Sequence, residues 1–487
     1  MLCKADGLIC PPAPPRLHAW APPLAAVAVR VLFAALSLEL TPTLAQQAPA
    51  PQEAGAPEPP ATAGDRSRAR GDEAETPDST EQGQTPLTES FERRPLHELI
   101  EESKLEGIRD TRFNVQLRSM YLDSYNLNRS ENQAWALGGS AGVKSGYFGG
   151  RIAFGATGYT SQRLEGPPDM DGTLLLRPVQ RGYSVLGELY GEVLLTDAVR
   201  ATAGRRVLET PFINTQDSRM TPNTFQEYAI QGLIGGRNDT PSLRFGAGYV
   251  DKIKTRDSED FVSMATAAGA PAGVERGVYA AGALYKAGEL YIGLVEYYSA
   301  DIINIAYTEA KYAVPFADRV RLQFAVQYCD QRSTGEDLLT RHTFSTDQFG
   351  VKVELAMGPG LLTAARTGTA TGANMRNPWG GYPGYASVQV ENFDRAGEDA
   401  TLLRAAYNFP RVVGLSAYGL WVHGSTPAAP KQYAQDEYDF DLQWKAWETR
   451  LKGLKLRARY AHVTQAGPGD KHQDDIRLIL SYDLPRH

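Results

Sequence analysis

The sequence predicts an all-β protein, built as a transmembrane antiparallel β-barrel. The first observation is a persistent alternation of apolar and polar residues from Arg112 onward. This period of two is expected of strands with one apolar and one polar face. The second is that the alternating runs reach about ten residues, the length that a tilted strand needs to cross a bilayer. The third is that Arg, Lys and Asp occupy the polar faces, as a water-filled lumen allows.

The alternation recurs along the chain with turns rich in Gly, Pro, Asn and Asp between the runs. A soluble β-sandwich gives the same period, but aromatic residues at the ends of the apolar faces favour a membrane barrel with an interfacial girdle. About 375 residues, at roughly 20 per strand and connection, predict about 16 to 18 strands and an aqueous channel. The clearest runs are 112–121, 318–328, 348–355, 438–447, 454–460 and 475–484.

Composition excludes several other classes of protein. The formal net charge of the 487 residues is −7, so no basic character indicates a nucleic-acid partner. Of the 3 cysteines, Cys3 and Cys10 precede an apparent export signal, which leaves Cys329 without a disulfide partner. The Cys and His spacings match no metal site, and no cofactor motif is present, so we expect neither a metal nor a cofactor. The histidines are scattered and no nucleophile motif accompanies them, which argues against catalytic residues.

The N-terminal part of the chain divides into two segments ahead of the barrel. Leu24–Ala45 is the one long apolar run and ends with small residues at Thr43 and Ala45, so residues 1–45 are predicted to be a signal peptide. A membrane anchor is the alternative for this run. Residues 46–94 are rich in Pro, Ala and Glu and have almost no large apolar residues, which predicts a disordered extension. The barrel domain is then 95–487.

The stretch from Gly204 to Tyr228 breaks the alternation on either side of it. It combines bends with clustered opposite charges and cannot lie in lipid, because its backbone groups would be unpaired there. It is predicted to be a long ordered loop, and in a barrel such a loop can fold inward and narrow the lumen. The residues that form these bends and charged groups are Arg205, Arg206, Pro211, Phe212, Asp217, Ser218, Arg219, Pro222 and Asn223.

Three motifs in order resemble a known family. They are Thr215–Met220 with Pro222–Phe225, Asn377–Tyr385 with Asn392–Glu398, and Gly453–Ala461 with Arg477–Ile479. On these residues the sequence resembles the OprD family of outer-membrane porins, the substrate-specific channels of Pseudomonas-type bacteria, over roughly Glu102 to Pro485. The resemblance implies an 18-stranded barrel in the Gram-negative outer membrane, monomeric or a loose trimer. It also implies a ladder of basic side chains that guides carboxylate-bearing solutes to a constriction.

Alternation places several arginines on the lumen side, and these are the candidate pore-lining residues. Arginine suits carboxylates because its planar fork binds both oxygens. For Asp217 two roles are open, repelling anions or holding Arg219 in place. Each arginine is alternatively a solvated wall residue or half of a salt bridge. The candidate ladder is Arg404, Arg457, Arg459 and Arg477, with Arg366 as a weaker member, and the candidate constriction is Arg205, Arg206, Asp217 and Arg219.

The leading hypothesis is a passive outer-membrane porin for small, carboxylate-containing solutes such as amino acids and organic acids. The alternatives are a barrel enzyme, a plugged structural barrel and a soluble secreted β-protein. The expected partners are outer-membrane lipid, small anionic or zwitterionic solutes and the barrel assembly machinery.

Overall fold

The computed structural model describes residues 106–236, 240–317, 319–446, 451–469 and 471–484. The predicted signal peptide and the predicted extension lie outside the described residues. No helix within the described ranges is both long and apolar enough to span a membrane.

The described chain consists of strands, one 3-10 turn η1 (Pro178–Gln180) and one short helix α4 (Met264–Ala268). The strands are β1 (Arg112–Tyr125), β2 (Glu131–Lys144), β3 (Ile152–Glu165), β4 (Tyr183–Thr196), β5 (Val199–Arg206), β6 (Thr224–Gly235), β7 (Ser242–Lys254), β8 (Val262–Ser263), β9 (Val278–Ala287), β10 (Leu290–Ser299), β11 (Ile303–Ala317), β12 (Val320–Arg332), β13 (Ser345–Met357), β14 (Gly360–Thr369), β15 (Asp399–Asn408), β16 (Leu415–Gly424), β17 (Gln435–Lys445), β18 (Leu454–Gln465) and β19 (Lys471–Asp483).

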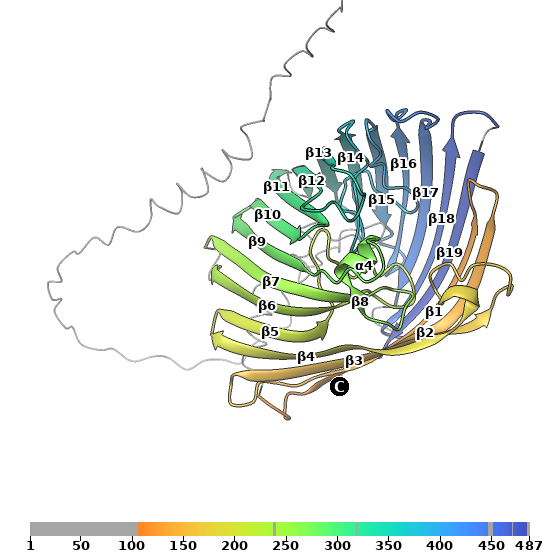
Figure 1. Ribbon diagram of the computed structural model, residues 1–487. Coiled ribbons are helices and arrows are strands. Elements are labelled where there is room, and N and C mark those ends of the chain that lie inside the picture. Colours follow the sequence, from red (N-terminus) through yellow and green to blue (C-terminus); the bar gives the residue numbers. More distant parts are fainter. Residues whose placement is uncertain (1–105, 237–239, 318, 447–450, 470, 485–487) are drawn as a thin grey trace, which may run out of the picture. The chain divides into compact units, whose positions relative to one another are not determined.

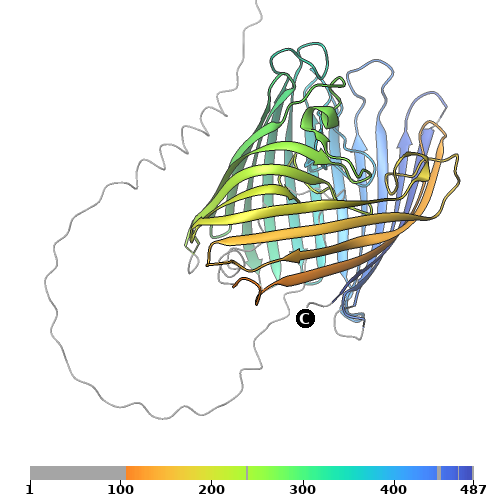
Figure 2. The same ribbon diagram turned by 60° about the horizontal axis from the view of Figure 1, so that its bottom comes forward.

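The sheet closes on itself to form a barrel (Figures 1 and 2). Strands that follow one another pair antiparallel, and β1 pairs with both β2 and β19. Among the nineteen strands of the described sheet, the two-residue β8 pairs only with the end of β7, so eighteen strands form the wall. Each of the eighteen wall strands in the described sheet is therefore paired on both sides, which is the condition for strands to cross a bilayer. The predicted all-β barrel is therefore confirmed.

The two faces of the wall have opposite character, as the alternation predicts. On β17, Tyr438 and Phe440 are 49% and 52% exposed, whereas Asp439 and Asp441, which alternate with them, are buried. On β1, Phe113 and Leu117 are likewise exposed. The apolar side chains thus point outward and the charged ones point inward, the reverse of a soluble protein and the arrangement expected in lipid.

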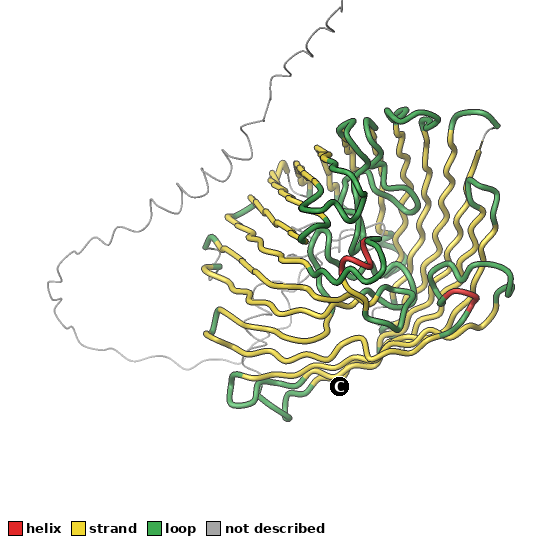
Figure 3. The backbone as a smooth tube through the Cα atoms, viewed as in Figure 1, coloured by secondary structure: helices red, strands yellow, loops and turns green. Residues whose placement is uncertain are grey.

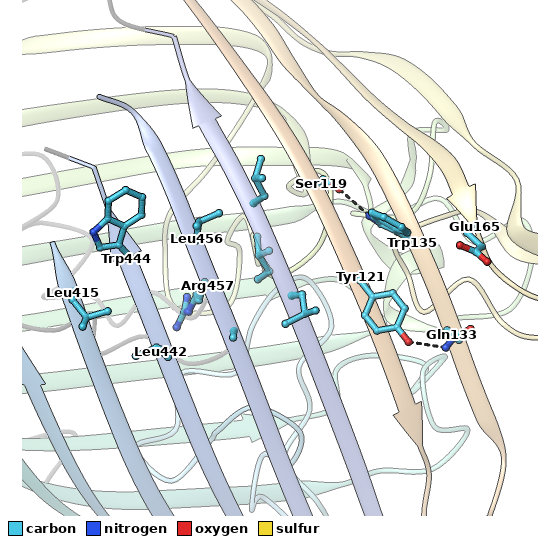
Figure 4. Close-up of a pocket in the computed structure, with 14 residues that line it drawn as sticks. Ser119, Tyr121, Gln133, Trp135, Glu165, Leu415, Leu442, Trp444, Leu456 and Arg457 are labelled. Atoms are coloured by element: carbon cyan, nitrogen blue, oxygen red, sulfur yellow. Dashed lines mark hydrogen bonds between the residues drawn. The ribbon is translucent and has the colours of Figure 1, made fainter. Parts of the chain in front are cut away.

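The outer face near the seam between β19 and β1 shows how aromatic side chains are placed (Figure 4). Trp135 and Trp444 lie among outward-facing leucines that line a shallow groove. The indole Nε1 of Trp135 donates to Ser119 Oγ at 2.9 Å, and Gln133 Nε2 donates to Tyr121 OH at 2.7 Å. Such amphipathic rings suit the membrane interface, where one part of the ring is apolar and the other is wet.

The longest connections enter the barrel from one end. Antiparallel order puts the loops 166–182, 207–223, 255–277 and 370–398 at the same end, and short turns at the other. Phe212 and Ile213 are 0% and 1% exposed and pack with Tyr297 and Tyr307 of the wall. Figure 3 shows loop segments and α4 within the ring of strands. The core of this fold therefore lies inside the barrel, between the loops and the wall.

Candidate functional site

Loop 207–223 is fastened to the barrel wall by an ion pair. Arg118 of β1 donates from Nη1 to Asp217 Oδ1 at 2.5 Å and from Nη2 to Asp217 Oδ2 at 2.9 Å. The same Nη1 donates to the carbonyl oxygen of Arg219 at 2.6 Å. Asp217 therefore holds the loop through Arg118, and its carboxylate does not bind the Arg219 side chain. The alternating pattern puts Arg118 on the polar face of its strand, but nothing in the sequence indicates this partner.

Loops 207–223 and 370–398 also hold each other. The buried Asn214 side chain donates from Nδ2 to the Gly381 oxygen at 3.0 Å and accepts at Oδ1 from the Gly381 nitrogen at 2.7 Å. Ile213 and Trp379 form a parallel β-bridge, and Trp379 Nε1 donates to the Met264 oxygen at 2.8 Å. The two loops and α4 are thereby one packed unit inside the barrel.

Two loop arginines lie deep within the barrel without a carboxylate partner. Arg219 donates from Nε to the Thr173 oxygen at 2.9 Å, and Arg256 donates from Nη1 to Ser218 Oγ at 2.6 Å. Among the described residues, neither guanidinium has a carboxylate at ion-pair distance. Both side chains remain partly accessible, as groups that face an aqueous lumen do.

The charges of these two arginines and of a third, Arg477, act on one another. Burial lowers the pKa of Arg219, and the nearby charges of Arg477 and Arg256 lower it further. Burial and Arg477 also lower the pKa of Arg256, to about 10. Like charges that disfavour each other in this way favour a bound anion. We call Arg219, Arg256 and Arg477 the central arginine cluster.

Arg477 connects this cluster to the second inward loop. Its Nε donates to Asp475 Oδ1 at 2.6 Å, and its Nη2 donates to the carbonyl oxygen of Gln389 at 3.1 Å. Gln389 also donates from Nε2 to Asp475 Oδ1 at 2.8 Å. Loop 370–398 therefore reaches across the lumen from β14 to β19 and fixes the orientation of this guanidinium.

Arg457 and Arg459 share one carboxylate. The Nε atoms of both side chains lie close to Asp441 Oδ2, at 2.7 Å for Arg457 and 2.8 Å for Arg459. Arg459 also donates from Nη2 to Tyr418 OH at 3.0 Å, and Arg404 stacks on the same ring with its Cζ 4.0 Å from the centroid. The candidate ladder from β15 to β19 is thus a contiguous row on the inner face.

The remaining predicted residues lie elsewhere. Arg206 is buried, donates from Nη1 to Glu192 Oε1 at 3.2 Å and belongs to a separate charged group. Arg205 lies on the opposite face of β5, with its Cζ 4.2 Å from the centroid of the Phe261 ring. Arg366 is mostly exposed on the outward face of β14 and pairs with Asp399, so its inclusion in the ladder was wrong.

The structure adds Arg118 and Arg256 to the basic residues predicted for the interior. Arg118 lies within the alternating run 112–121, on the same face as Asn114 and Gln116. Arg256 lies in loop 255–277, where no periodic pattern places a side chain, so sequence reasoning missed it.

A closed barrel with an apolar exterior and a charged interior defines a transmembrane β-barrel of the outer-membrane type. A family model described as outer membrane porin, OprD family, matches residues 106–486. The chain belongs to the OprD family of outer membrane porins. It is therefore a substrate-specific channel of the Gram-negative outer membrane and not an enzyme.

Solved structures of similar fold agree with this assignment. Pseudomonas aeruginosa OccK9 (OpdG) is 24% identical, with a TM-score of 0.69 over 78% of this chain and 100% of that chain. Pseudomonas aeruginosa OccK8 (OprE) is 21% identical, with a TM-score of 0.68, and the match covers 78% of this chain and 99% of that chain. Pseudomonas aeruginosa OpdK with vanillate is 19% identical, with a TM-score of 0.66, and the match covers 78% of this chain and 99% of that chain. Among proteins with curated descriptions, none matches this sequence.

Proposed function

We propose that this porin conducts small solutes that carry a carboxylate group, such as amino acids and organic acids, past the central arginine cluster. The observation that carries the proposal is the position of Arg219 and Arg256 next to Arg477. Neither of the two loop arginines has a carboxylate at ion-pair distance among the described residues. These two guanidinium groups therefore remain available for direct contact with an anionic solute.

Such charge attracts anions strongly inside a barrel. A narrow polar path between low-dielectric walls focuses the field and raises the local concentration of counter-ions. A guanidinium fork offers two parallel hydrogen bonds to a carboxylate, which adds geometric preference to the charge. Passage also requires release, and several weak sites in a row allow a solute to move from one to the next. The row Arg404, Arg459, Arg457 supplies such further sites.

The acids in the same region act as positioning groups in this proposal. Asp441 holds Arg457 and Arg459, and Asp475 holds Arg477, by contacts of 2.6 to 2.8 Å. Each carboxylate fixes a guanidinium in one orientation, so less side-chain entropy is lost when a solute binds. Asp217 has a different role, because its contact with Arg118 fixes loop 207–223 across the interior. We propose that this loop is the constriction.

One similar structure is consistent with the chemistry. The OpdK structure was obtained with vanillate, which carries a carboxylate. At 19% identity this likeness shows the fold alone, so the assignment for this chain depends on its own arginines.

The experiment is a solute-uptake assay in proteoliposomes. We would compare acetate and glutamate with glycerol for the wild-type protein and for the double variant Arg219→Gln, Arg256→Gln. Arg366→Gln, on the outer face, is the matched control. We expect the double variant to lose its preference for the anions over glycerol while glycerol uptake is retained. Equal preference in the wild type and the double variant would contradict the proposal, provided that both migrate as folded barrels in the gel-shift assay.

A further inference from the structure

We propose that the barrel contains a second solute site, in a recess beneath loop 207–223, that binds organic acids with an apolar body. This inference rests on the proposed conduction of carboxylates and adds a class of solute to it. The recess has a volume of about 440 Å³ and lies between residues 207–210 of the loop and the inner faces of β5, β6, β7, β9 and β10. It shares no residue with the central arginine cluster.

The recess extends toward the end of the barrel that carries the short turns. It is lined by Arg200, Arg244 and Leu284, which lie close to the short turns that follow β4, β6 and β9. Outer-membrane barrels have their short turns on the periplasmic side. A solute that has passed the central arginine cluster therefore reaches this recess next, before it leaves the channel.

One side of the recess is apolar and unusually open. Gly246 and Gly248 of β7 and Ala280 and Gly282 of β9 line it, so two neighbouring strands present almost bare backbone there. Val295, Tyr297, Leu208 and Ile213 add larger apolar surfaces around this wall. Small residues on facing strands leave room for the body of a ligand, and apolar neighbours make its burial favourable.

The other side of the recess offers a buried guanidinium with an unused hydrogen-bond donor. Arg206 is 6% exposed and lines the recess. Its Nη1 donates to Glu192, but its buried Nε has no hydrogen-bond partner and lies 3.6 Å from Glu227 Oε1, beyond hydrogen-bond reach. A buried donor without an acceptor is costly. An acceptor oxygen delivered by a ligand satisfies it.

Three arginines, Arg200, Arg206 and Arg244, line the recess together with two acids, Glu209 and Glu227. Glu192 is held by Lys144 at 3.4 Å, by Arg206 at 3.2 Å and by Arg200 at 4.0 Å, and its Oε2 also accepts from Tyr147 OH at 3.0 Å. Three cations thus surround this one buried carboxylate, and Glu227 is the other acid that contacts Arg206. The geometry therefore fits a carboxylate near Arg206 with its apolar body against Gly246 and Gly282.

The test uses two neighbouring residues on opposite faces of one strand. A Cβ added at Gly246 meets nothing closer than the Ile230 oxygen at 3.6 Å, so Gly246→Leu fills the recess without backbone strain. Ala247 also borders the recess, but it is an exposed residue on the outer face of β7, so Ala247→Leu is the matched control. The readout is block of single-channel chloride current by hexanoate and by acetate, which carry the same charge on bodies of different size.

In the wild type and in Ala247→Leu we expect hexanoate to block about tenfold more strongly than acetate, the ratio for burial of about two methylene groups. In Gly246→Leu the ratio should fall to about one, with acetate block unchanged. The proposed site in the recess is contradicted if Gly246→Leu keeps the preference for hexanoate, or if the wild type does not have it. If acetate does not block the wild-type channel and the wild type shows no anion preference, the proposed function is contradicted instead.

Discussion

Arg118 and Asp217 form a bidentate ion pair that ties the inward loop to the first strand of the barrel. Both terminal guanidinium nitrogens, Nη1 and Nη2, and both carboxylate oxygens take part, at 2.5 and 2.9 Å. Among the described residues, no other ion pair joins the loop to β1. The inward loop is therefore tied to the wall by a contact between residues that are 99 positions apart in the sequence.

Breaking this pair should widen the channel. We expect Arg118→Ala and Asp217→Ala each to raise single-channel conductance and to increase current noise, because the loop loses its tie to β1. Asp217 is 42% exposed on its side chain, so the coupling between the two residues should be about 1 kcal/mol in a double-mutant cycle of unfolding. The control cycle is Arg366 with Asp399, a pair more than half exposed on both sides, with a coupling near zero. Equal couplings in the two cycles would show that the loop is held by other contacts.

Removing a lumen carboxylate should have the opposite effect on selectivity from removing a lumen arginine. Asp441→Asn leaves Arg457 and Arg459 without their shared carboxylate, and we expect anion preference to rise. Arg457→Gln with Arg459→Gln should lower it. The measurement is the reversal potential under a salt gradient. If both substitutions moved the reversal potential in the same direction, these side chains would not act through their charge.

Asn214 should be important for the packing of the two inward loops. Its amide makes reciprocal hydrogen bonds with the backbone of Gly381 and is completely buried. Asn214→Ala leaves both backbone groups of Gly381 without their partner, so we expect a loss of about 1 to 3 kcal/mol in unfolding free energy. Asn214→Asp should be similarly unfavourable, because a carboxylate cannot donate to the Gly381 oxygen. Wild-type stability in both variants would argue against a joint role of the loops.

Loop 370–398 should be held more firmly at acidic than at alkaline pH. Burial first, and then the charges of Glu398 and Glu391, raise the pKa of Asp394 from 3.8 to about 7. A raised acid pKa means that the folded loop favours the protonated form, so its contribution to stability is complete below about pH 4 and is lost as the pH rises through about 7.

We therefore expect amide hydrogen exchange in this loop, corrected for the intrinsic rate, to be faster at pH 8 than at pH 5. Asp394→Asn should remove the difference, since an amide does not titrate. Persistence of the full pH dependence in Asp394→Asn would assign it to another group, such as Glu391.

The wall of this barrel was predictable from sequence, because successive residues of a strand point to opposite faces of the sheet. Tyr438 and Phe440 alternate with Asp439 and Asp441, and no information from elsewhere in the chain is needed to separate them. The same alternation explains the position of Arg366. It lies an even number of residues from Leu362, so both side chains are on the outward face of β14.

The interior was predictable only in part. The break in alternation at Gly204–Tyr228 located the inward loop, but the loop spans only 207–223, because the two ends of the predicted stretch belong to β5 and β6. The family resemblance indicated that arginines line the pore. The partner of Asp217, the contact of Asn214 with Gly381 and the position of Arg256 depend on contacts between distant segments. The spacing of residues along the chain does not predict such contacts, so a three-dimensional structure was required to find the central arginine cluster.

The most direct test of the account is the reversal potential of the purified channel in a planar bilayer under a potassium chloride gradient, measured for the wild type and for Arg219→Gln with Arg256→Gln. We predict a chloride-preferring potential in the wild type that moves toward the value of a non-selective pore in the double variant. A cation-preferring wild type, or a potential that the double substitution leaves unchanged, would contradict the claim that these arginines select the solute.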